Sequence, residues 1–364
     1  MDDLMNMIDT PAVLIDLDKL DRNLKSMADK MNRANVNLRP HIKTHKSQYI
    51  AHEQLKHGAV GITVASLGEA EVMHEAGIDD ILIAYPIVGD LKLERLRKLM
   101  ETCNITISLD SIEVAKELSQ LGEKINKNIL LYVDVDTGLN RCGKSPGEET
   151  KKLVQEIDEL PYVDVIGIMT HAGHAYSKKS LPEVKEVAKQ EAEDLVNTKK
   201  LLAWEDKDLI VSVGSTPTAH FIEDEVGVAE ARQGAYVFGD RSQLYLGLIE
   251  RNQCAMTILA TVVSTPRKGT AIIDAGSKTF SSDINDKFLG YGEWTENPDV
   301  YLERLSEEHG ILHLPEGVNL NIGQKITIIP NHCCAVTNLH NQLYGIRNGK
   351  IERMINVDAR GKTQ

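Results

Sequence analysis

Apolar, β-branched runs alternate with segments of helical periodicity through about the first 250 residues, and this alternation limits the fold more than any other feature of the sequence. About eight strand-helix units occur between residues 36 and 248, with strands predicted at 37–43, 61–66, 80–86, 104–110, 129–136, 164–171, 209–215 and 227–234. Strict alternation implies parallel strands joined by crossover helices. Eight such units predict an α/β fold with a closed (β/α)8 barrel of the TIM type.

The sequence changes character after residue 250. Residues 255–266, 269–280, 324–332 and 341–357 have the pattern of strands joined by turns, with few helical stretches between them. We therefore expect a (β/α)8 barrel over residues 18–250 and a C-terminal β-rich domain over residues 251–364. The opening strand within residues 1–17 is predicted to join the β-rich domain.

Composition and charge exclude several classes of partner. A net charge of −13 argues against nucleic acid, because phosphate binding needs clustered Lys and Arg over a wide surface. No run approaches the roughly 18 apolar residues of a membrane span. The acidic N-terminus lacks the pattern of a signal peptide, and five cysteines without disulfide-like spacing suit a reducing compartment. The expected location is the cytoplasm.

Polar residues that follow each predicted strand are the candidate site residues, because barrel enzymes build their sites at the C-terminal ends of the strands. These residues are His41, Lys43 and His45 after the first strand, Asp134, Asp136 and Arg141 after the fifth, His171, His174 and Tyr176 after the sixth, Gly214, Ser215 and Thr216 after the seventh, and Arg232, Gly234 and Tyr236 after the eighth.

The glycine and hydroxyl residues after the last two strands favour a phosphate site. Glycine lets backbone N–H groups approach phosphate oxygens, and these residues also occur in ordinary turns, so their place in the last two barrel loops decides the interpretation. Lys43 would face this site and is a candidate for covalent attachment of pyridoxal phosphate. Its basic neighbours Arg39, His41 and His45 could lower its pKa. Arg141 could hold the phenolic oxygen of the cofactor, or form a surface ion pair with Asp136.

A second cluster lies in residues 328–340. His332 and Cys334 are two positions apart, so on a strand their side chains would face the same side. An imidazole and a thiolate are good Zn²⁺ ligands, and two protein ligands leave positions open for water or substrate. Core packing is the alternative for a buried cysteine, and it is the expected role of Cys333.

Eight motifs, taken in order along the chain, resemble one family. The segments RPHIKTHK, DVDTGLNRCG, MTHAGHAY, VSVGSTPT, EARQGAYVFGD, DAGSKTFSSD, LSEEHG and PNHCCAVTNL are similar to those of the alanine-racemase-like, fold-type III pyridoxal-phosphate enzymes, in the branch of the D-serine dehydratases and D-threonine aldolases. The resemblance implies that the protein is a homodimer with sites near the interface. It leaves open whether the partner subunit completes each site.

The resemblance also assigns roles to individual residues. It implies that Lys43 is the Schiff-base lysine and that Arg141 lies by the phenolic oxygen, with His171 and Tyr176 also near the cofactor. It places the phosphate in the loops of Gly214, Ser215, Thr216, Gly234 and Tyr236, and a divalent metal, Zn²⁺ or alternatively Mn²⁺, on His332 and Cys334. Arg232 stands where alanine racemases pair an arginine with the pyridine nitrogen, but Glu230 is close enough in sequence to leave that partner open.

The expected activity is that of a pyridoxal-phosphate-dependent lyase acting on a small D-β-hydroxy amino acid such as D-serine or D-threonine. In a β-elimination, Lys43 takes the Cα proton and the metal assists loss of the β-hydroxyl, giving a 2-oxo acid and ammonia. The alternative is retro-aldol cleavage to glycine and an aldehyde, with His171 or His174 as the base. The resemblance bears on this choice, because aldolases of this branch have a Gln-His pair after the sixth strand and His-x-Asp at the metal. This chain has no such pair and has His-x-Cys, and both departures are more similar to the dehydratases without deciding between the two reactions.

Two further alternatives fit the sequence less well. A racemase has no use for a metal at the substrate hydroxyl, and non-catalytic pyridoxal-phosphate carriers are smaller, single-domain chains. The roles of Asp274, Lys278, Glu308 and His309 stay open at this stage.

Overall fold

The computed structural model describes residues 7–202 and 208–364 and divides the chain into two compact units. The unit called here the barrel unit comprises Met27–Lys43, Ile50–Gly234 and Gly361–Gln364. The unit called here the β unit comprises Met1–Ser26, Thr44–Tyr49 and Ala235–Arg360. The short segment Thr44–Tyr49 belongs to the β unit because it is bonded there: the Gln48 N–H donates to Asp358 Oδ2 at 2.8 Å, and the Arg353 guanidinium lies 4.0 Å from the centre of the Tyr49 ring. The predicted domain boundaries at residues 18 and 250 remain a proposal.

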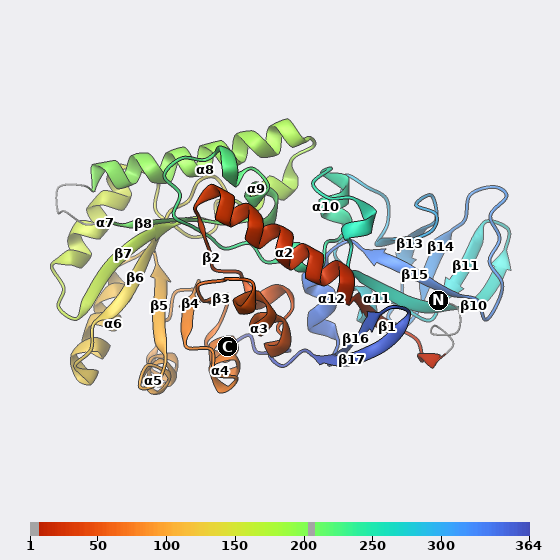
Figure 1. Cartoon of the computed structure of the whole chain (residues 1–364), viewed down its shortest axis with the longest axis horizontal. Coiled ribbons are helices and arrows are strands. Elements are labelled where there is room, and N and C mark those ends of the chain that lie inside the picture. Colours follow the sequence, from red (N-terminus) through yellow and green to blue (C-terminus); the bar gives the residue numbers. More distant parts are fainter. Residues whose placement is uncertain (1–6, 203–207) are drawn as a thin grey trace. The chain divides into compact units, whose positions relative to one another are not determined.

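Eight parallel strands form the sheet of the barrel unit (Figure 1). The pairing order is β2 (Asn37–Leu38), β9 (Glu230–Ala231), β8 (Ile210–Val213), β7 (Val163–Met169), β6 (Ile129–Asp134), β5 (Asn104–Leu109), β4 (Asp80–Ile83) and β3 (Ile62–Val64). The sheet closes on itself, since His41 forms a parallel bridge with Thr63 and the Val60 N–H donates to the Leu38 carbonyl at 2.9 Å. The predicted (β/α)8 barrel is confirmed.

Helices alternate with these strands, as the sequence periodicity predicts. They are α2 (Leu17–Ala34), α3 (Gln48–Lys56), α4 (Leu67–Glu75), α5 (Asp90–Leu99), α6 (Ile112–Ile125), α7 (Glu148–Asp158), α8 (Leu181–Leu201) and α9 (Thr216–Ala219). Ser66 and Ser180 start α4 and α8, because each hydroxyl accepts a hydrogen bond from the N–H three residues on. The helical segment expected over 186–205 ends at Leu201, and its residues 203–205 lie outside the described residues.

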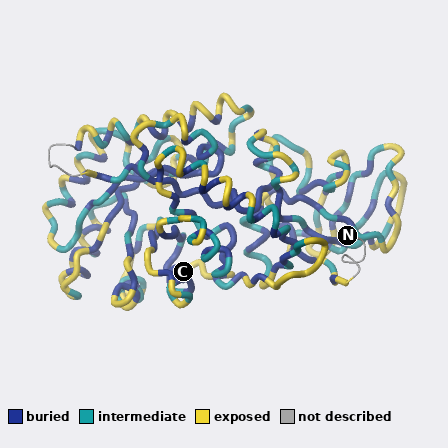
Figure 2. Tube along the Cα trace, viewed as in Figure 1, coloured by how far each residue is buried: buried dark blue, intermediate teal, exposed yellow. Residues whose placement is uncertain are grey.

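The core of the barrel unit consists of aliphatic side chains on the strands. Residues such as Ile62, Ile81, Ile107, Leu131 and Val211 are fully buried. Figure 2 shows this burial along the strands, with exposed positions gathered on the helices and loops. Burial of branched side chains on a parallel sheet covered by helices is the expected source of stability for this architecture. Within the two described ranges, no helix is long and apolar enough to cross a membrane.

The β unit is built around a closed antiparallel barrel. Its strands are β10 (Met256–Arg267), β11 (Thr270–Ile273), β14 (Gly310–His313), β13 (Tyr301–Leu305), β12 (Gly292–Trp294) and β15 (Lys325–Pro330), and β10 pairs with both β11 and β15 to close the ring. The opening strand β1 (Ala12–Asp16) pairs antiparallel with β10 and parallel with β16 (Gln342–Arg347), which pairs in turn with β17 (Lys350–Asn356). The prediction that the opening strand joins the β-rich domain is therefore confirmed.

Several local predictions are wrong. His332 and Cys334 do not lie on a strand: β15 ends at Pro330, His332 precedes the helix α12 (Cys333–Leu339), and Cys334 lies in its first turn. Pairing stops there because the Asn331 carbonyl accepts hydrogen bonds from the Ser242 N–H and hydroxyl instead of from a strand. The strands predicted at 37–43 and 227–234 shrink to two residues each, and Pro40 cannot donate to a ladder. Strands β12, β13 and β14 carried no strand prediction.

Candidate active site

A pocket of about 360 Å³ opens at the C-terminal ends of the barrel strands. Seven of the candidate residues that follow predicted strands line it, and they come from five different loops: His41, Lys43, Asp134, Arg141, His171, Gly214 and Arg232. Lys43 lies in the 3₁₀ turn Ile42–Thr44 that follows β2, so the predicted link between strand-end position and site membership holds for this residue. Gly214 has no room for a side chain, because a Cβ would stand 3.1 Å from the Arg232 backbone nitrogen and Cβ.

The electrostatics of the pocket suit an anionic ligand. Burial holds the pKa of His41 well below its usual range, and the positive charge of Lys43 lowers it further. Burial likewise lowers the pKa of His171 to about 3, with a further contribution from Lys43. Both imidazoles are therefore neutral at physiological pH, and the cations of the pocket are Lys43, Arg141 and Arg232. An amine with two guanidinium groups in a concave site fits an aldehyde cofactor with an anionic ring oxygen and a phosphate.

His171 has a defined tautomer. Its Nδ1 makes a short hydrogen bond with the Gly214 carbonyl oxygen, which can only accept. Nδ1 therefore carries the hydrogen and Nε2 keeps a lone pair. A neutral imidazole with a free lone pair in the pocket has the chemistry of a general base.

Asp134 is a pocket residue to which the sequence assigned no role, although it is among the candidates after the fifth predicted strand. It is the last residue of β6, only 8% exposed, and it lines the pocket. Burial raises its pKa to about 7, and the charges of Arg232 and Arg141 oppose that rise. The signal was present in the sequence, since Asp134 ends a predicted strand, but two carboxylates follow that strand and the sequence does not say which one faces inward.

The structure separates the roles of Arg232 and Glu230. Arg232 is buried and donates to the Ser212 hydroxyl and the Thr170 carbonyl, both on the barrel strands or at their ends. Glu230 accepts from Ser212 Oγ and from Arg39 Nε, each at 2.7 Å. Arg232 lines the pocket, whereas both carboxylate oxygens of Glu230 are engaged outside its lining.

The basic neighbours of Lys43 in the sequence have partners or are neutral, and their effect on the Lys43 pKa stays a prediction. The Arg39 guanidinium pairs with Glu230 at 2.7 Å and with Asp80 at 2.5 Å, so its charge is compensated. His41 is neutral. His45 belongs to the β unit, where its Nδ1 accepts from the Ser47 N–H at 3.1 Å.

The other predicted residues occupy nearby loops but are outside the pocket lining. His174 and Tyr176 lie in the 3₁₀ turn Gly173–Ser177, and His174 Nδ1 is buried with no hydrogen-bond partner in the described part of the chain. Ser215 caps α9, and its hydroxyl is 2.9 Å from Thr218 Oγ1. The remaining three predicted residues are buried: Thr216, Gly234 and, in the β unit, Tyr236. Their roles toward a phosphate stay predictions.

The predicted metal ligands meet at the start of α12 in the β unit. The Cys333 thiol hydrogen-bonds to Cys334 and, with the charge of His332, holds the pKa of Cys334 well below its usual range despite burial. The resulting thiolate raises the pKa of His332 to about 11, against the effect of burial. Thr44 Oγ1, on the residue after Lys43, lies 3.2 Å from Cys334 Sγ. A thiolate and an imidazole in mutual contact are a donor set that fits Zn²⁺.

A different metal-type cluster lies in the barrel unit. Ligand atoms of His74, Asp79 and Cys103 lie within 4.8 Å of one another. Both His74 nitrogens are already bonded, to Asp79 at 2.7 Å and to Thr102 at 2.8 Å, and burial raises the pKa of Cys103 to about 12. A protonated thiol and an occupied imidazole do not favour a metal, so His332 and Cys334 remain the better candidates.

The residues whose roles the sequence left open have structural partners. Asp274 accepts from Thr10 Oγ1 at 2.5 Å and from the Thr261 N–H at 2.8 Å, which ties β11 to β10. Lys278 and Glu308 form an exposed ion pair of 2.6 Å. The His309 carbonyl accepts from the Ser306 N–H at 2.9 Å and closes the β13–β14 hairpin.

Comparison with known families gives matches along most of the chain. Residues 15–242 match the family described as alanine racemase, N-terminal domain, and residues 255–346 match the putative serine dehydratase domain. The D-threo-3-hydroxyaspartate dehydratase of Delftia sp. (strain HT23) is 32% identical over 356 residues, which covers 92% of this chain and 93% of that enzyme.

Solved structures agree over almost the full length. A D-threonine aldolase from Filomicrobium marinum has a TM-score of 0.89 and 31% identity, covering 98% of this chain and 97% of its own. A D-threo-3-hydroxyaspartate dehydratase in a metal-free form, with a cysteine-to-alanine substitution, has a TM-score of 0.89 and 30% identity, covering 97% of this chain and 98% of its own. A further form of that dehydratase carries a histidine-to-alanine substitution two positions before that cysteine.

Proposed function

Because the chain belongs to the alanine-racemase-like, fold-type III pyridoxal-phosphate enzymes, in the branch of lyases that includes D-serine dehydratases and D-threonine aldolases, we propose that it catalyses β-elimination on D-β-hydroxy amino acids. D-serine and D-threonine are the proposed substrates, with a 2-oxo acid and ammonia as products. We also propose that the protein is a homodimer and is located in the cytoplasm.

The barrel pocket is the proposed cofactor site. Lys43 would hold pyridoxal phosphate covalently, Arg141 would face its phenolic oxygen, and Arg232 would face the pyridine nitrogen. Arg232 is preferred to Glu230 because it lines the pocket, while Glu230 is engaged by Arg39 and Ser212. The loops of Gly214–Thr216 and Gly234–Tyr236 are proposed for the phosphate. When bound, the cofactor supplies a ring that stabilises negative charge on Cα.

The side chains then divide the proton transfers. The Lys43 amine, once displaced by the amino group of the substrate, would take the Cα proton, since it is the one amine among the pocket residues. His171 stays neutral with its Nε2 lone pair available, and could accept a proton from a substrate hydroxyl. His332 and Cys334 would hold Zn²⁺, which supplies Lewis acidity toward the β-hydroxyl. Zn²⁺ is preferred to Mn²⁺ because a thiolate is a soft ligand.

The observation that carries the dehydratase proposal is the contact between His332 and Cys334. The D-threo-3-hydroxyaspartate dehydratase has substituted forms at a histidine and a cysteine with the same spacing, and the cysteine variant is metal-free. This relative therefore supports the proposed metal-ligand pair as well as the proposed role of the barrel.

Aldol cleavage is the second candidate, and one observation favours it. The D-threonine aldolase is as similar in structure as the dehydratase, and His171 presents a lone pair in the pocket. In that reaction His171 would remove the hydroxyl proton and the Cα–Cβ bond would break. His174 is a weaker base candidate, because it is outside the pocket lining.

Product analysis with D-threonine, with and without a chelator, separates these candidates. The dehydratase proposal expects ammonia and 2-oxobutanoate in equal amounts, lost on chelation and restored by Zn²⁺. Glycine and acetaldehyde would establish the aldolase instead. L-allo-threonine as product would point to a racemase, because inversion at Cα leaves Cβ unchanged, and bound cofactor with no product from D-serine, D-threonine or D-threo-3-hydroxyaspartate would point to a carrier.

A further inference from the structure

We propose that Asp283 is the positioning residue of the metal ligand His332. This inference rests on the proposed metal site and extends it to Asp283, the last residue of the motif DAGSKTFSSD, to which the sequence assigned no role. Asp283 Oδ2 lies 2.9 Å from His332 Nδ1, and the two residues are separated by 48 others in the sequence. A carboxylate only accepts, so Nδ1 carries the hydrogen and Nε2 is the nitrogen left for a metal.

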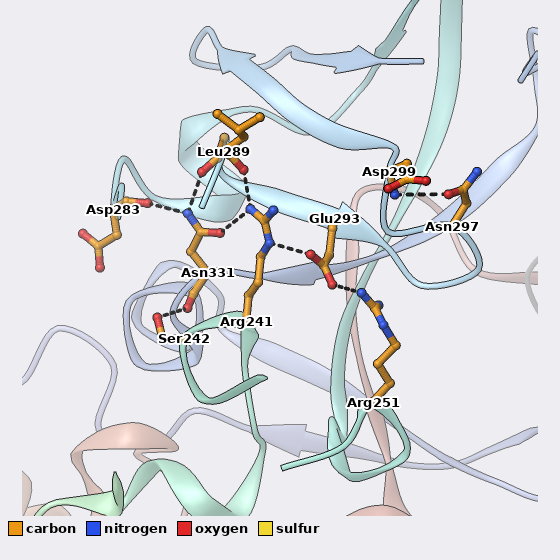
Figure 3. Close-up of polar contacts among 10 residues, drawn as sticks. Arg241, Ser242, Arg251, Asp283, Leu289, Glu293, Asn297, Asp299 and Asn331 are labelled. Atoms are coloured by element: carbon orange, nitrogen blue, oxygen red, sulfur yellow. Dashed lines mark hydrogen bonds and ion pairs between the residues drawn. The ribbon is translucent and has the colours of Figure 1, made fainter. Parts of the chain in front are cut away.

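The loop that carries Asp283 is anchored by the residue next to the metal ligand. Asn331, only 4% exposed, donates from Nδ2 to the Asp283 carbonyl at 3.2 Å and to the Gly290 carbonyl at 2.8 Å. These two carbonyls are near the two ends of the loop between α11 (Ser277–Phe280) and β12. Asn331 therefore fixes the backbone of Asp283, and the next residue in the chain is the proposed metal ligand His332. Figure 3 shows the hydrogen bond between Asn331 and Asp283.

A buried ionic network holds Asn331 in turn (Figure 3). Arg241 Nη1 donates to Asn331 Oδ1 at 3.3 Å and to the Leu289 carbonyl, while Arg241 Nε pairs with Glu293 at 2.6 Å. Arg251 pairs with the other oxygen of Glu293. The guanidinium of Arg241 also lies 4.5 Å from the centre of the Phe288 ring, so the same arginine contacts three points of the loop or its anchor.

This arrangement gives Asp283 two effects on His332. The hydrogen bond fixes the rotation of the imidazole, so that Nε2 keeps one direction, and the carboxylate charge makes the ring a better donor. Side chains in this position typically change metal affinity by about 10- to 100-fold. Asp283 and His332 are both about half exposed, with side-chain exposures of 49% and 47%, so the lower half of that range is expected.

The test is the affinity of the full-length protein for Zn²⁺, measured by competition with a fluorescent chelator. Asp283→Ala should weaken Zn²⁺ binding by about 10- to 30-fold. Asp286→Ala is the matched control, because it removes the same charge from the same exposed loop and should change affinity by less than about threefold. The melting temperatures of the metal-free variants should agree. With Co²⁺ in place of Zn²⁺, the absorption bands of Asp283→Ala should shift, since the imidazole is reoriented.

Each outcome of this experiment supports or overturns the proposed role of Asp283. Equal Zn²⁺ affinity for Asp283→Ala and Asp286→Ala, with wild-type binding intact, overturns the role of Asp283 and leaves the proposed function standing. A wild-type protein that binds no Zn²⁺ overturns both. If Asp283→Ala melts lower without metal, Asp283→Asn takes its place, because it keeps the size and one acceptor oxygen. An affinity for Asp283→Asn between those of the wild type and Asp283→Ala supports the role, and one equal to wild type overturns the contribution of the charge.

Discussion

His171 in the barrel pocket and His332 in the β unit are held in opposite protonation states. Burial and the positive charge of Lys43 lower the pKa of His171 to about 3. The Cys334 thiolate raises the pKa of His332 to about 11, although burial alone would lower it. Burial has the larger effect at His171 and the thiolate charge has the larger effect at His332, so the same residue type is a neutral base in one centre and a cation in the other.

The two centres also differ in how the chain assembles them. The pocket gathers seven candidate residues from five loops, so it depends on the register of a closed parallel sheet. The proposed metal-ligand pair comes from one helix start, and the groups that contact it, Asp283 and Thr44, come from elsewhere in the chain. We therefore expect the function of the pocket to be sensitive to the loss of single charged groups. We expect the proposed metal pair to be sensitive to the loss of the Cys334 thiolate, on which the charge of His332 depends.

Lys43→Ala is the substitution with the largest expected effect. It removes the amine of the pocket, so turnover of D-threonine should fall by at least about 1,000-fold. Reduction with borohydride should leave no cofactor covalently attached, as mass spectrometry of the intact chain would reveal. Lys25→Ala, on the exposed side of α2, is the control and should keep both properties. Substantial turnover by Lys43→Ala would contradict the assignment of the proton transfer.

Cys334→Ala tests the opposite centre and should weaken Zn²⁺ binding by at least about 100-fold. Without the thiolate, the pKa of His332 should also return toward its usual range, which an NMR titration of the imidazole would detect. Cys333→Ala is the matched control at the next position. Its side chain is fully buried and its thiol stabilises the Cys334 thiolate, so the variant should lose stability and should weaken Zn²⁺ binding less than Cys334→Ala does. The reverse order of affinities would exchange the roles of the two cysteines.

The sequence predicts the pocket better than the groups that tune it. Lys43 and Gly214 follow apolar runs of a repeated unit, and a closed barrel brings the ends of such runs together whatever the loops contain. The pattern around Arg39 does not predict that Glu230 and Asp80 compensate its charge. The compensating contacts join residues that are far apart in the sequence, so no local sequence pattern predicts them.

The local structure at His332 was mispredicted for a related reason. The run that ends at Pro330 favours a strand, and nothing in residues 331–334 marks a helix start, since the residue before α12 is a histidine whose side chain makes no cap. The helix starts there because Asn331 is bonded to Ser242 and to the loop of residues 283–290. The role of Asp283 was likewise not predicted: it ends the motif DAGSKTFSSD, but its partner His332 lies on a different element.

Asp134→Asn should change the pH dependence of stability in a defined direction. The folded-state pKa of about 7 exceeds the unfolded value of 3.8, so the native state binds more protons between these pH values and wild-type stability falls as pH rises through them. The Asp134→Asn variant has no carboxylate at this position, so its stability does not fall with rising pH for this reason. Its advantage in unfolding free energy over the wild type should therefore grow by about 2–4 kcal/mol from pH 4 to pH 7.5.

Urea unfolding of the cofactor-free protein at several pH values measures that difference. Asp29→Asn, an exposed carboxylate on α2, is the control and should track the wild type throughout. A constant difference between Asp134→Asn and wild type would mean that Asp134 is ionised in the folded protein over the whole range. Its contacts with Arg232 and Arg141 would then outweigh its burial.

Glu308→Gln has the smallest expected effect and bounds how far the metal centre extends into the β unit. Glu308 and Lys278 form an ion pair, but their side chains are 63% and 65% exposed, so water screens the pair and its loss should leave the melting temperature unchanged within error. Zn²⁺ affinity and D-threonine turnover should also match the wild type, because Asp283, and not the β13–β14 hairpin, contacts His332. A clear drop in turnover with unchanged Zn²⁺ affinity would contradict this. It would place the hairpin in contact with the substrate or with a second copy of the chain, and would extend the site beyond the groups that hold the metal.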